Sequence, residues 1–428
     1  MQRMQDHELT LPYGDRQVTF RVPHTYTVEV LLPREVPPAE DPLATLAQAL
    51  DAPLDAPPLE ELARGRRSVT IVVDDLTRLT PVPLILPLLL ERLAQAGVRE
   101  GQVKVLVALG THRAMTDEEL RKRVGEEAWG RVPVLNHAHW EPGELVDLGP
   151  TRSGTPIHLN RHVVEADLVI GVGSVFPHHI AGYSGGSKII QPGVSGAATT
   201  GATHFTSART RRSYLGILQN PIREEMDAVA EAAGMQVCLN CVLTRHGDLV
   251  QAFYGAPRAV LAAAAAKADA IYGVPFQAQA DVVVAGSYPA DIEFWQAHKT
   301  LYPADLVVRE GGIIVVVTPC PEGLAVTHPE MVELAGLSSE DLVRRVEAGQ
   351  VEDLVGAGLA LAWAQVKERA QVWIVSDGIS DEVARAVRFV PFPSVQEAVD
   401  AALRQAEPGA RVAAIPYAPE CLPLHRPA

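Results

Sequence analysis

Two short polar segments of this 428-residue chain contain side chains suited to acid–base chemistry, and each follows a hydrophobic run typical of a β-strand. These segments are DDLTR (74–78) and GTHR (110–113). In a parallel α/β sheet the carboxyl ends of the strands lie at one edge, where ligands bind. We therefore expect the carboxylate of Asp75, the guanidinium of Arg78 and the imidazole of His112 at one edge of a sheet.

Two further segments extend this group of side chains. The segment FPHHIAGYSGGSKIIQPGVSG (176–196) follows a third apolar run, and His204 comes shortly after it. The segment WQAHK (295–299) follows a fourth run, at 281–285. Glycine pairs let backbone approach a ligand closely, and an imidazole accepts and returns a proton near neutral pH. The four segments together predict one site with acid, base and anion-binding groups.

Two general motifs nearly fit the third segment. GYSGG (182–186) matches the G-x-S-x-G nucleophile elbow, which requires a strand directly before the serine and a helix directly after it. Here Pro177-His178-His179 precedes the motif and Pro192-Gly193 breaks the chain soon after it, so an α/β serine hydrolase using Ser184 is kept only as the alternative function. The phosphate-loop pattern fails because Ser187 replaces the glycine before Lys188. The CxxC pair at 238–241 has no second pair nearby, as a zinc site would need.

The composition sets outer limits on function. A net charge of −15 argues against nucleic acid or an anionic membrane as a partner. With 47% hydrophobic and 21% charged residues the chain resembles a globular protein, and no apolar stretch is long enough to cross a bilayer. The N-terminus lacks the apolar core of a signal peptide, and four cysteines do not make a disulfide framework. We expect a cytoplasmic protein.

The chain alternates strand-like and helix-like stretches, which predicts an α/β fold of two domains with mainly parallel sheets flanked by helices. The strand runs are continuously apolar, as expected where helices cover both faces of a sheet. We expect an N-terminal α/β domain at 1–274, which carries the lysine and histidines. A C-terminal α/β domain is expected at 275–408, followed by a tail at 409–428 that returns to the N-terminal domain.

The four segments, which occur in order between residues 74 and 299, closely resemble those of the nickel-dependent lactate racemase family. The resemblance implies a nickel-pincer nucleotide, pyridinium-3,5-bisthiocarboxylic acid mononucleotide nickel, covalently linked to Lys188. It implies that His204 is the protein ligand to nickel and that Asp75 is a cofactor-binding residue. Soft sulfur and imidazole donors suit square-planar nickel(II). Cofactor-biosynthesis proteins are then required as partners.

The same resemblance implies a racemase or epimerase of a lactate-like 2-hydroxy acid that acts by reversible hydride transfer. His112 and His178 are the implied acid/bases, with His179 as the other candidate for the second position. The substrate carboxylate would be bound by three side chains, those of Arg78, Gln296 and Lys299. Because these side chains come from both predicted domains, the active site is expected in the inter-domain cleft. The sequence leaves open which acid is the substrate and how many copies assemble.

A non-catalytic sensor of the cofactor is a weaker third possibility. Binding alone would not need both His112 and His178, so their joint presence favours an enzyme.

Overall fold

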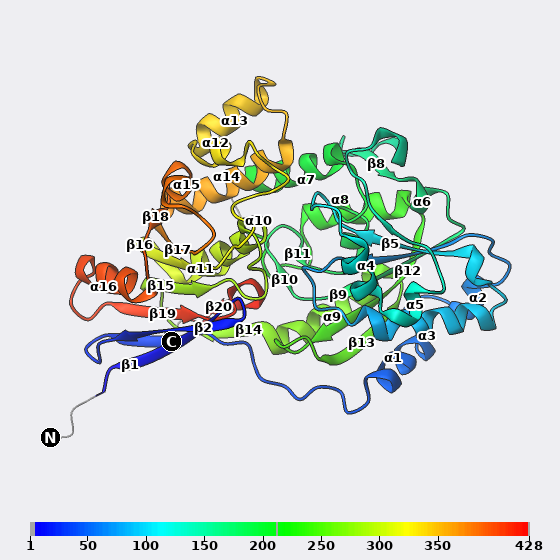
Figure 1. Cartoon of the computed structure of the whole chain (residues 1–428), viewed down its shortest axis with the longest axis horizontal. Helices are drawn as coiled ribbons and strands as arrows, with labels where there is room; N and C mark the ends of the chain where they lie inside the picture. The colour runs from blue at the N-terminus through cyan, green and yellow to red at the C-terminus, as the bar shows by residue number, and fades with distance from the viewer. Residues whose placement is uncertain (1–4, 211–212, 427–428) are drawn as a thin grey trace. The chain divides into compact units, whose positions relative to one another are not determined.

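Two units make up the computed structural model, which describes residues 5–210 and 213–426. The central unit comprises residues 35–203 and 216–271. The terminal unit comprises the described residues of 1–34, 204–215 and 272–428. Each unit is built on a six-stranded, mainly parallel sheet with helices packed on it, as the sequence predicts (Figure 1).

The grouping of segments differs from the expected one in three places, and one of these is the segment 204–215 with His204, which belongs to the terminal unit. Strand β3 (Thr27–Val30) pairs in parallel with β19 (Arg411–Ile415), so the N-terminal segment belongs to the terminal unit. Strand β20 (Leu422–His425) pairs with β14 (Gly273–Phe276), also in the terminal unit. Both pairings join segments more than a hundred residues apart, and local sequence patterns carry no information about such partners.

The sheet of the central unit has the strand order β13-β12-β9-β4-β5-β6, with only the β12–β13 pair antiparallel. The elements of this unit are α1 (Pro42–Asp51), α2 (Leu59–Ala63), β4 (Val69–Asp74), α3 (Val82–Gln95), η1 (Glu100–Gln102), β5 (Val103–Ala108), α4 (Asp117–Val124), α5 (Glu126–Trp129), β6 (Val134–Asn136), η2 (Pro142–Glu144), β7 (Leu145–Pro150), β8 (Pro156–Asn160), α6 (Arg161–Val164), β9 (Leu168–Ser174), β10 (Pro177–His178), β11 (Gly182–Tyr183), η3 (Gly186–Ile189), α8 (Pro221–Ala232), β12 (Met235–Leu243) and β13 (Leu249–Gly255). Helices α7 (Ala197–Arg209) and α9 (Pro257–Tyr272) have residues in both units.

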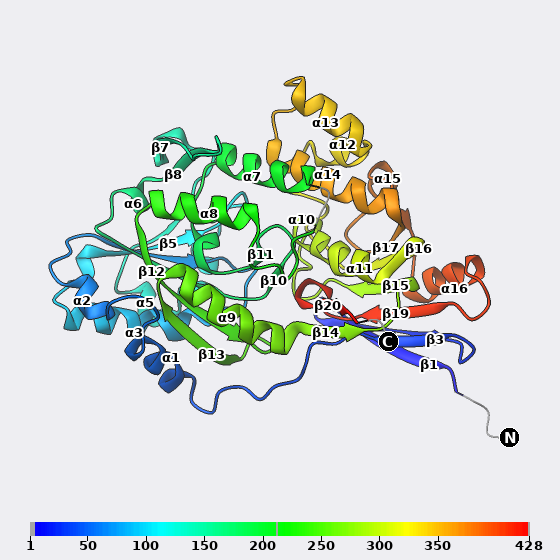
Figure 2. The ribbon, with the colours of Figure 1, turned by 180° about the vertical axis from the view of Figure 1, so that it is seen from behind.

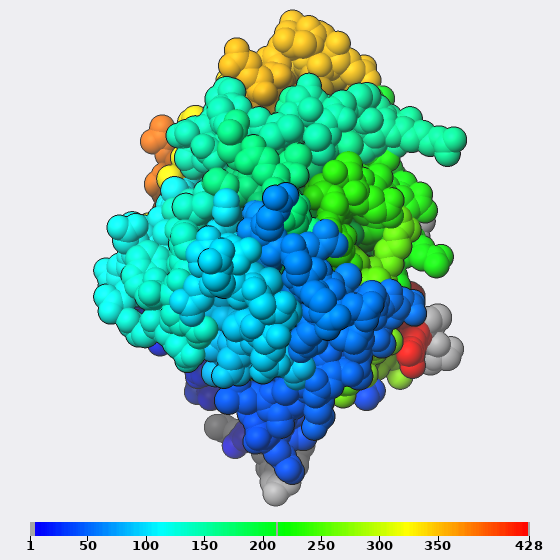
Figure 3. Space-filling view, turned by 90° about the vertical axis from the view of Figure 1, so that its right-hand side faces the viewer, coloured from blue at the N-terminus to red at the C-terminus, as the bar shows by residue number. Residues whose placement is uncertain are grey.

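Alternate residues of the central strands enter two separate hydrophobic cores. On β4, Ile71 and Val73 pack with α1, α2, α3 and α4, whereas Val72 packs with α6, η3, α8 and α9. Figure 2 shows α8 and α9 of the second group, and the blue surface in Figure 3 includes α1 and α2 of the first group. Because side chains alternate along a strand, continuous apolar runs are required where both faces are covered.

The strand order of the central unit contains a topological switch point between β4 and β9. From β4 the chain continues to β5 and β6 on one side, whereas β9 and β12 lie on the other side. Loops that leave two such strands in opposite directions open a crevice at their carboxyl ends. The segments that begin at Asp75 and at Val175 leave the sheet at this point.

The terminal unit has the strand order β18-β17-β16-β15-β19-β3, in which every pair is parallel. Its remaining elements are β1 (His7–Tyr13), β2 (Arg16–Val22), β15 (Ala280–Gly286), α10 (Phe294–Ala297), η4 (His298–Thr300), α11 (Leu301–Val307), β16 (Val308–Val317), α12 (Met331–Ala335), α13 (Ser339–Glu347), α14 (Leu354–Arg369), β17 (Gln371–Val375), α15 (Asp381–Ala386), β18 (Val390–Pro391), α16 (Val395–Gln405) and η5 (Ala418–Glu420). The β1–β2 hairpin and α16 cover one face of this sheet. Among the described helices of both units, none is long and apolar enough to cross a membrane.

Close packing behind the lysine-bearing segment generates a first prediction. A Cβ on Gly193 would lie 2.0 Å from the carbonyl oxygen of Ile189 and 3.0 Å from Cβ of Ala108. We expect Gly193→Ala to lower the stability of the fold by about 1–3 kcal/mol, because the core has no space for the methyl group. The midpoint of urea unfolding measures the effect. Gly101→Ala is the matched control, since no heavy atom lies within 4 Å of its added Cβ. Equal midpoints for both variants would contradict the prediction.

Candidate functional site

Asp75 follows β4 directly and is held by hydrogen bonds from two residues. Its Oδ1 accepts from the backbone N–H of Thr77 at 3.1 Å and from the Thr77 hydroxyl at 2.6 Å. Its Oδ2 lies 2.5 Å from Nδ1 of His112, which follows β5. The side chain is buried, so its position is fixed from two directions. The structure thus brings together two residues that the sequence placed at one sheet edge.

The charge of Asp75 determines the tautomer of His112. Burial by itself raises the pKa of the carboxyl, but His112, Arg78 and Thr77 together outweigh burial and hold the pKa of Asp75 well below its usual range. The carboxylate is therefore ionised at neutral pH and accepts a hydrogen bond from the Nδ1–H group of His112. In the neutral ring, Nε2 is then the nitrogen with a lone pair. This arrangement is that of an oriented general base.

Arg78 lies in the same turn. Its Nη1 donates to the Thr77 carbonyl at 3.0 Å and to the Thr77 hydroxyl at 2.7 Å, and its guanidinium lies 5.5 Å from the centre of the Phe176 ring. Phe176 comes from the segment after β9, so the contact joins the two strand ends of the switch point. An arginine so placed is able to bind an anion at this edge of the sheet.

Arg123 of α4 is a site residue that sequence reasoning missed. Its Nε donates to the Asp74 carbonyl at 2.7 Å, and its Nη1 donates to the carbonyls of Arg78 and Thr80, both at 3.1 Å. It also forms a short ion pair with the Asp74 carboxylate. Burial raises the pKa of Asp74, while Arg123 opposes this shift. Arg123 therefore holds the whole turn that carries Asp75 and Arg78.

His178 has the opposite tautomer to His112. It lies in the small β10–β11 hairpin, where its Nδ1 accepts from the backbone N–H groups of Ile180 at 3.2 Å and Ala181 at 3.3 Å. A nitrogen that accepts two hydrogen bonds carries no proton, so the neutral ring has its proton on Nε2. The ring stacks on His179 with centroids 4.9 Å apart.

Lys188 lies in η3 and is half-buried. Burial lowers the pKa of Lys188 to about 7, and the positive charges of Arg78 and Arg223 act in the same direction. The carboxylates of Asp74 and Asp75 oppose this shift. A large fraction of the amine is then neutral at neutral pH, which is the form that attacks a carbonyl or thiocarbonyl carbon.

The other predicted site residues belong to the terminal unit. His204 lies on α7. Burial holds the pKa of His298 well below its usual range, and the positive charges of Lys299 and His204 act in the same direction. Gln296 and Lys299 are buried, and the Lys299 ammonium donates to Oε1 of Gln296. The structure therefore pairs two of the three residues expected to bind the carboxylate.

Ser184 has a structural role in the hairpin. Its hydroxyl donates to the Ser174 carbonyl at 2.7 Å and accepts from the Phe176 N–H at 2.9 Å. These bonds join the end of β9 to β11, and neither partner is an imidazole. The thiols of Cys238 and Cys241 are buried within β12, and burial raises the pKa of both. These contacts give no support to a serine nucleophile or a redox pair.

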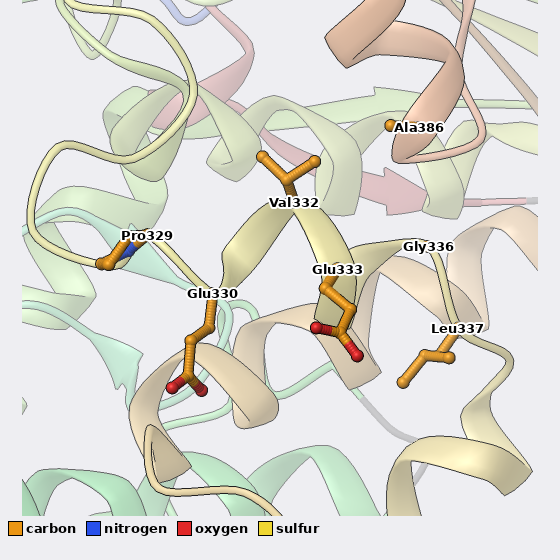
Figure 4. Close-up of a pocket in the computed structure, with 7 residues that line it drawn as sticks. All are labelled: Pro329, Glu330, Val332, Glu333, Gly336, Leu337 and Ala386. Atoms are coloured by element: carbon orange, nitrogen blue, oxygen red, sulfur yellow. The ribbon is translucent and has the colours of Figure 1, made fainter.

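Among the described residues, neither a protein-built metal cluster nor the hollow beside α12 coincides with the predicted site residues. Within residues 5–210 and 213–426, no group of three or more His, Cys, Asp or Glu side chains could hold a metal ion. An open hollow of about 650 Å³ lies beside α12 and the end of α15 (Figure 4). Its polar side chains are Glu330 and Glu333, and Glu333 is paired with Arg345 at 2.6 Å. It contains none of the predicted site residues.

The lowered pKa of Lys188 generates a second prediction. An ordinary lysine amine is neutral in roughly one molecule in a few thousand at pH 7, whereas a pKa of about 7 makes half of the Lys188 amines neutral. We expect pulse labelling of the cofactor-free protein with acetic anhydride to modify Lys188 with a midpoint near pH 7. Peptide mass spectrometry gives the extent of labelling, and labelling of the exposed Lys122 corrects for reagent loss. A midpoint above pH 9 would show that the amine is not perturbed.

Comparison with known proteins identifies the family. The sequence model of the lactate racemase N-terminal domain matches residues 13–216, and that of the lactate racemase C-terminal domain matches residues 276–418. The lactate racemase of Lactiplantibacillus plantarum is 28% identical over 383 residues, which is 87% of this chain and 88% of the relative. That of Thermoanaerobacterium thermosaccharolyticum is 28% identical over 323 residues, or 74% and 75% of the two chains.

Solved structures agree with this result at the level of the fold. The lactate racemase apoprotein from Thermoanaerobacterium thermosaccharolyticum superposes with a TM-score of 0.88 at 24% identity, covering 98% of this chain and 100% of the other. A Thermotoga maritima protein superposes with a TM-score of 0.71 at 19% identity, covering 86% and 96%. The two-domain α/β architecture expected from the sequence is confirmed. The chain belongs to the lactate racemase family.

Proposed function

We propose that this racemase inverts the C2 centre of a small, lactate-like 2-hydroxy acid with the help of a nickel-pincer nucleotide linked to Lys188. The observation that carries the proposal is the arrangement at the switch point of the central unit. This arrangement includes an oriented base, His112, with its partner Asp75 and the cation Arg78. The same unit carries Lys188, whose amine is partly neutral. Both relatives named above are lactate racemases, which supports a substrate of this class.

The described side chains fit such a cofactor. The neutral amine of Lys188 is suited to forming an amide-type bond. Such a group would itself supply sulfur donors to nickel, so one further ligand from the chain would be needed. His204 is proposed for this role because an imidazole suits nickel(II) alongside sulfur. Asp75 is proposed to contribute to cofactor binding through its fixed negative charge.

The chemistry that the bound group supplies is reversible acceptance of a hydride from C2 of the substrate. The chain must move the hydroxyl proton. His112 is proposed to accept it at Nε2, while the ionised Asp75 stabilises the resulting imidazolium through Nδ1. General-base assistance of this kind typically accelerates a reaction 10²- to 10⁴-fold.

His178 is proposed as the acid/base for the other enantiomer, and it starts as the other neutral tautomer. With two amides donating to Nδ1, the neutral ring offers an Nε2–H group and is ready to donate a hydrogen bond to the substrate oxygen. To hold a second proton the ring must give up the contacts with Ile180 and Ala181. The two histidines therefore present different groups at Nε2 in this structure, a lone pair in His112 and an N–H group in His178.

Binding of the substrate carboxylate is proposed for Arg78, Gln296 and Lys299. A guanidinium binds a carboxylate through two parallel hydrogen bonds, and a buried ammonium adds a strong charge-assisted bond. The existing bond between Lys299 and Gln296 orients the amide so that its N–H₂ group is directed to other partners.

The function is tested on protein produced together with a complete cofactor-biosynthesis pathway. We expect interconversion of D- and L-lactate, or of another acid in a panel of 2-hydroxy acids, and an intact-mass increase located on Lys188. Protein produced without the pathway is the inactive control. An unmodified Lys188 in protein from a competent pathway would refute the proposal. Labelling of Ser184 by a fluorophosphonate would instead favour a hydrolase.

A further prediction separates the histidines by role. His204→Ala is expected to lose both nickel and activity, because the chain then offers no ligand. His112→Ala should keep nickel but lose about 10²- to 10⁴-fold in turnover, and Asp75→Asn should weaken the same step. Nickel content by elemental analysis and chiral product assay distinguish the two outcomes. If His178→Ala turns over at the wild-type rate while His179→Ala does not, His179 is the second base.

A further inference from the structure

We propose that Arg223 is a positioning residue for Lys188, whose guanidinium fixes the backbone of the segment 181–185 and places a positive charge beside the lysine. The role of Lys188 as the attachment point rests on the proposed function. The contacts of Arg223 are present in the cofactor-free chain and are testable without the cofactor.

Three carbonyl groups of the glycine-rich segment accept hydrogen bonds from this one side chain. Nε and Nη2 of Arg223 donate to the Ala181 carbonyl at 3.2 and 3.1 Å, and Nη1 donates to the Gly185 carbonyl at 3.1 Å. Nη2 also donates to the Tyr183 carbonyl. Arg223 is buried, so none of these carbonyls would find water in its place. Only a planar group with several N–H donors satisfies all three carbonyls from one direction.

The start of α8 places Arg223 for this task. Asn220 caps the helix by accepting from the Arg223 N–H at 2.9 Å, and its amide donates to the Ile217 carbonyl at 2.8 Å. Asp227, one turn later, is paired with Arg258 at 3.3 Å. Asp227 also stabilises the charge of Arg223, whose N–H groups are directed at the carbonyls of the segment 181–185.

Two other residues complete the attachment of this segment. Asn240 of β12 accepts from the Gly186 N–H at 2.7 Å, and a Cβ on Gly185 would lie 2.8 Å from the same oxygen. The Tyr183 hydroxyl donates to the Gly216 carbonyl at 3.1 Å and to the Asp269 carboxylate. Segment 181–186 is thus fixed by α8, β12 and α9 immediately before Lys188. A displacement of this backbone would move the amine.

The charge of Arg223 has a second effect. It opposes protonation of Lys188 and so contributes, after burial and Arg78, to the lowered pKa of that lysine. Arg223 itself stays charged at neutral pH, because burial lowers its pKa only to about 10. One side chain therefore both holds the amine in place and favours its neutral form.

Three variants of the full-length, cofactor-free chain separate these effects. Arg223→Met removes both the hydrogen bonds and the charge, whereas Arg223→Lys keeps the charge but cannot bind all three carbonyls. Tyr183→Phe is the matched control, because it loosens the same segment without removing a positive charge. The readouts are hydrogen exchange of the amides at 182–188 and the pH midpoint of Lys188 labelling.

Arg223→Met should speed exchange of these amides at least ten-fold and raise the labelling midpoint by about half a pH unit or more, as expected for loss of a nearby like charge. Arg223→Lys should speed exchange but keep the midpoint near that of the wild type. Tyr183→Phe should speed exchange without moving the midpoint. Co-production with the cofactor pathway should then give less Lys188 adduct in Arg223→Met than in the wild type.

Unchanged exchange in Arg223→Met, or the same midpoint shift in all three variants, would overturn the inference. If Arg223→Met does not fold, the test rests on Arg223→Lys. Unchanged exchange in that variant overturns the inference, whereas faster exchange with an unchanged pH midpoint of Lys188 labelling supports it. A wild-type chain that never acquires an adduct would defeat the proposed function alone, because the exchange and labelling results do not depend on the cofactor.

Discussion

The buried, ionised carboxylate of Asp75 is the constraint around which the central unit is arranged. A buried charge is stable only when hydrogen bonds and opposite charges replace its water. His112, Thr77 and Arg78 supply these, and Arg123 holds the turn that carries two of them. The strands must therefore bring the ends of β4 and β5 side by side, and the apolar runs of those strands do so. The position of the proposed base follows from this need for charge compensation.

Positive charge is concentrated at the same place in an otherwise acidic protein. The chain has a net charge of −15, yet Arg78, Arg123 and Arg223 are all buried or half-buried in the central unit. Each donates to backbone carbonyls, and Arg123 is also paired with the Asp74 carboxylate. Such a site attracts an anionic ligand locally, although the field of the whole protein does not. The positive charges of Arg78 and Arg223 also add to the effect of burial in lowering the pKa of Lys188, which increases the neutral fraction of its amine.

Much of this site was predictable from the sequence, because its residues directly follow apolar strand runs. Asp75, Arg78 and His112 were expected at one sheet edge for that reason, and the structure places them together. Arg123 and Arg223 were not predictable, since each acts on backbone about forty residues away and lies on a helix with no distinguishing pattern. The opposite tautomers depend on one hydrogen bond at His112 and two at His178, which no spacing rule encodes. The pairing of β3 with β19 escaped prediction for the same reason, as a contact between distant segments.

That pairing has a consequence for the order in which the molecule is made. Synthesis from the N-terminus delivers all residues of the central unit by residue 271, so its sheet has every strand available while the ribosome is still at work. Strand β3 emerges much earlier but has no sheet to join until β19 appears some 380 residues later. During that interval its backbone N–H and C=O groups are exposed to unsuitable partners. The short length of β3 and the charge of Glu29 within it limit the chance of mispairing on the nascent chain.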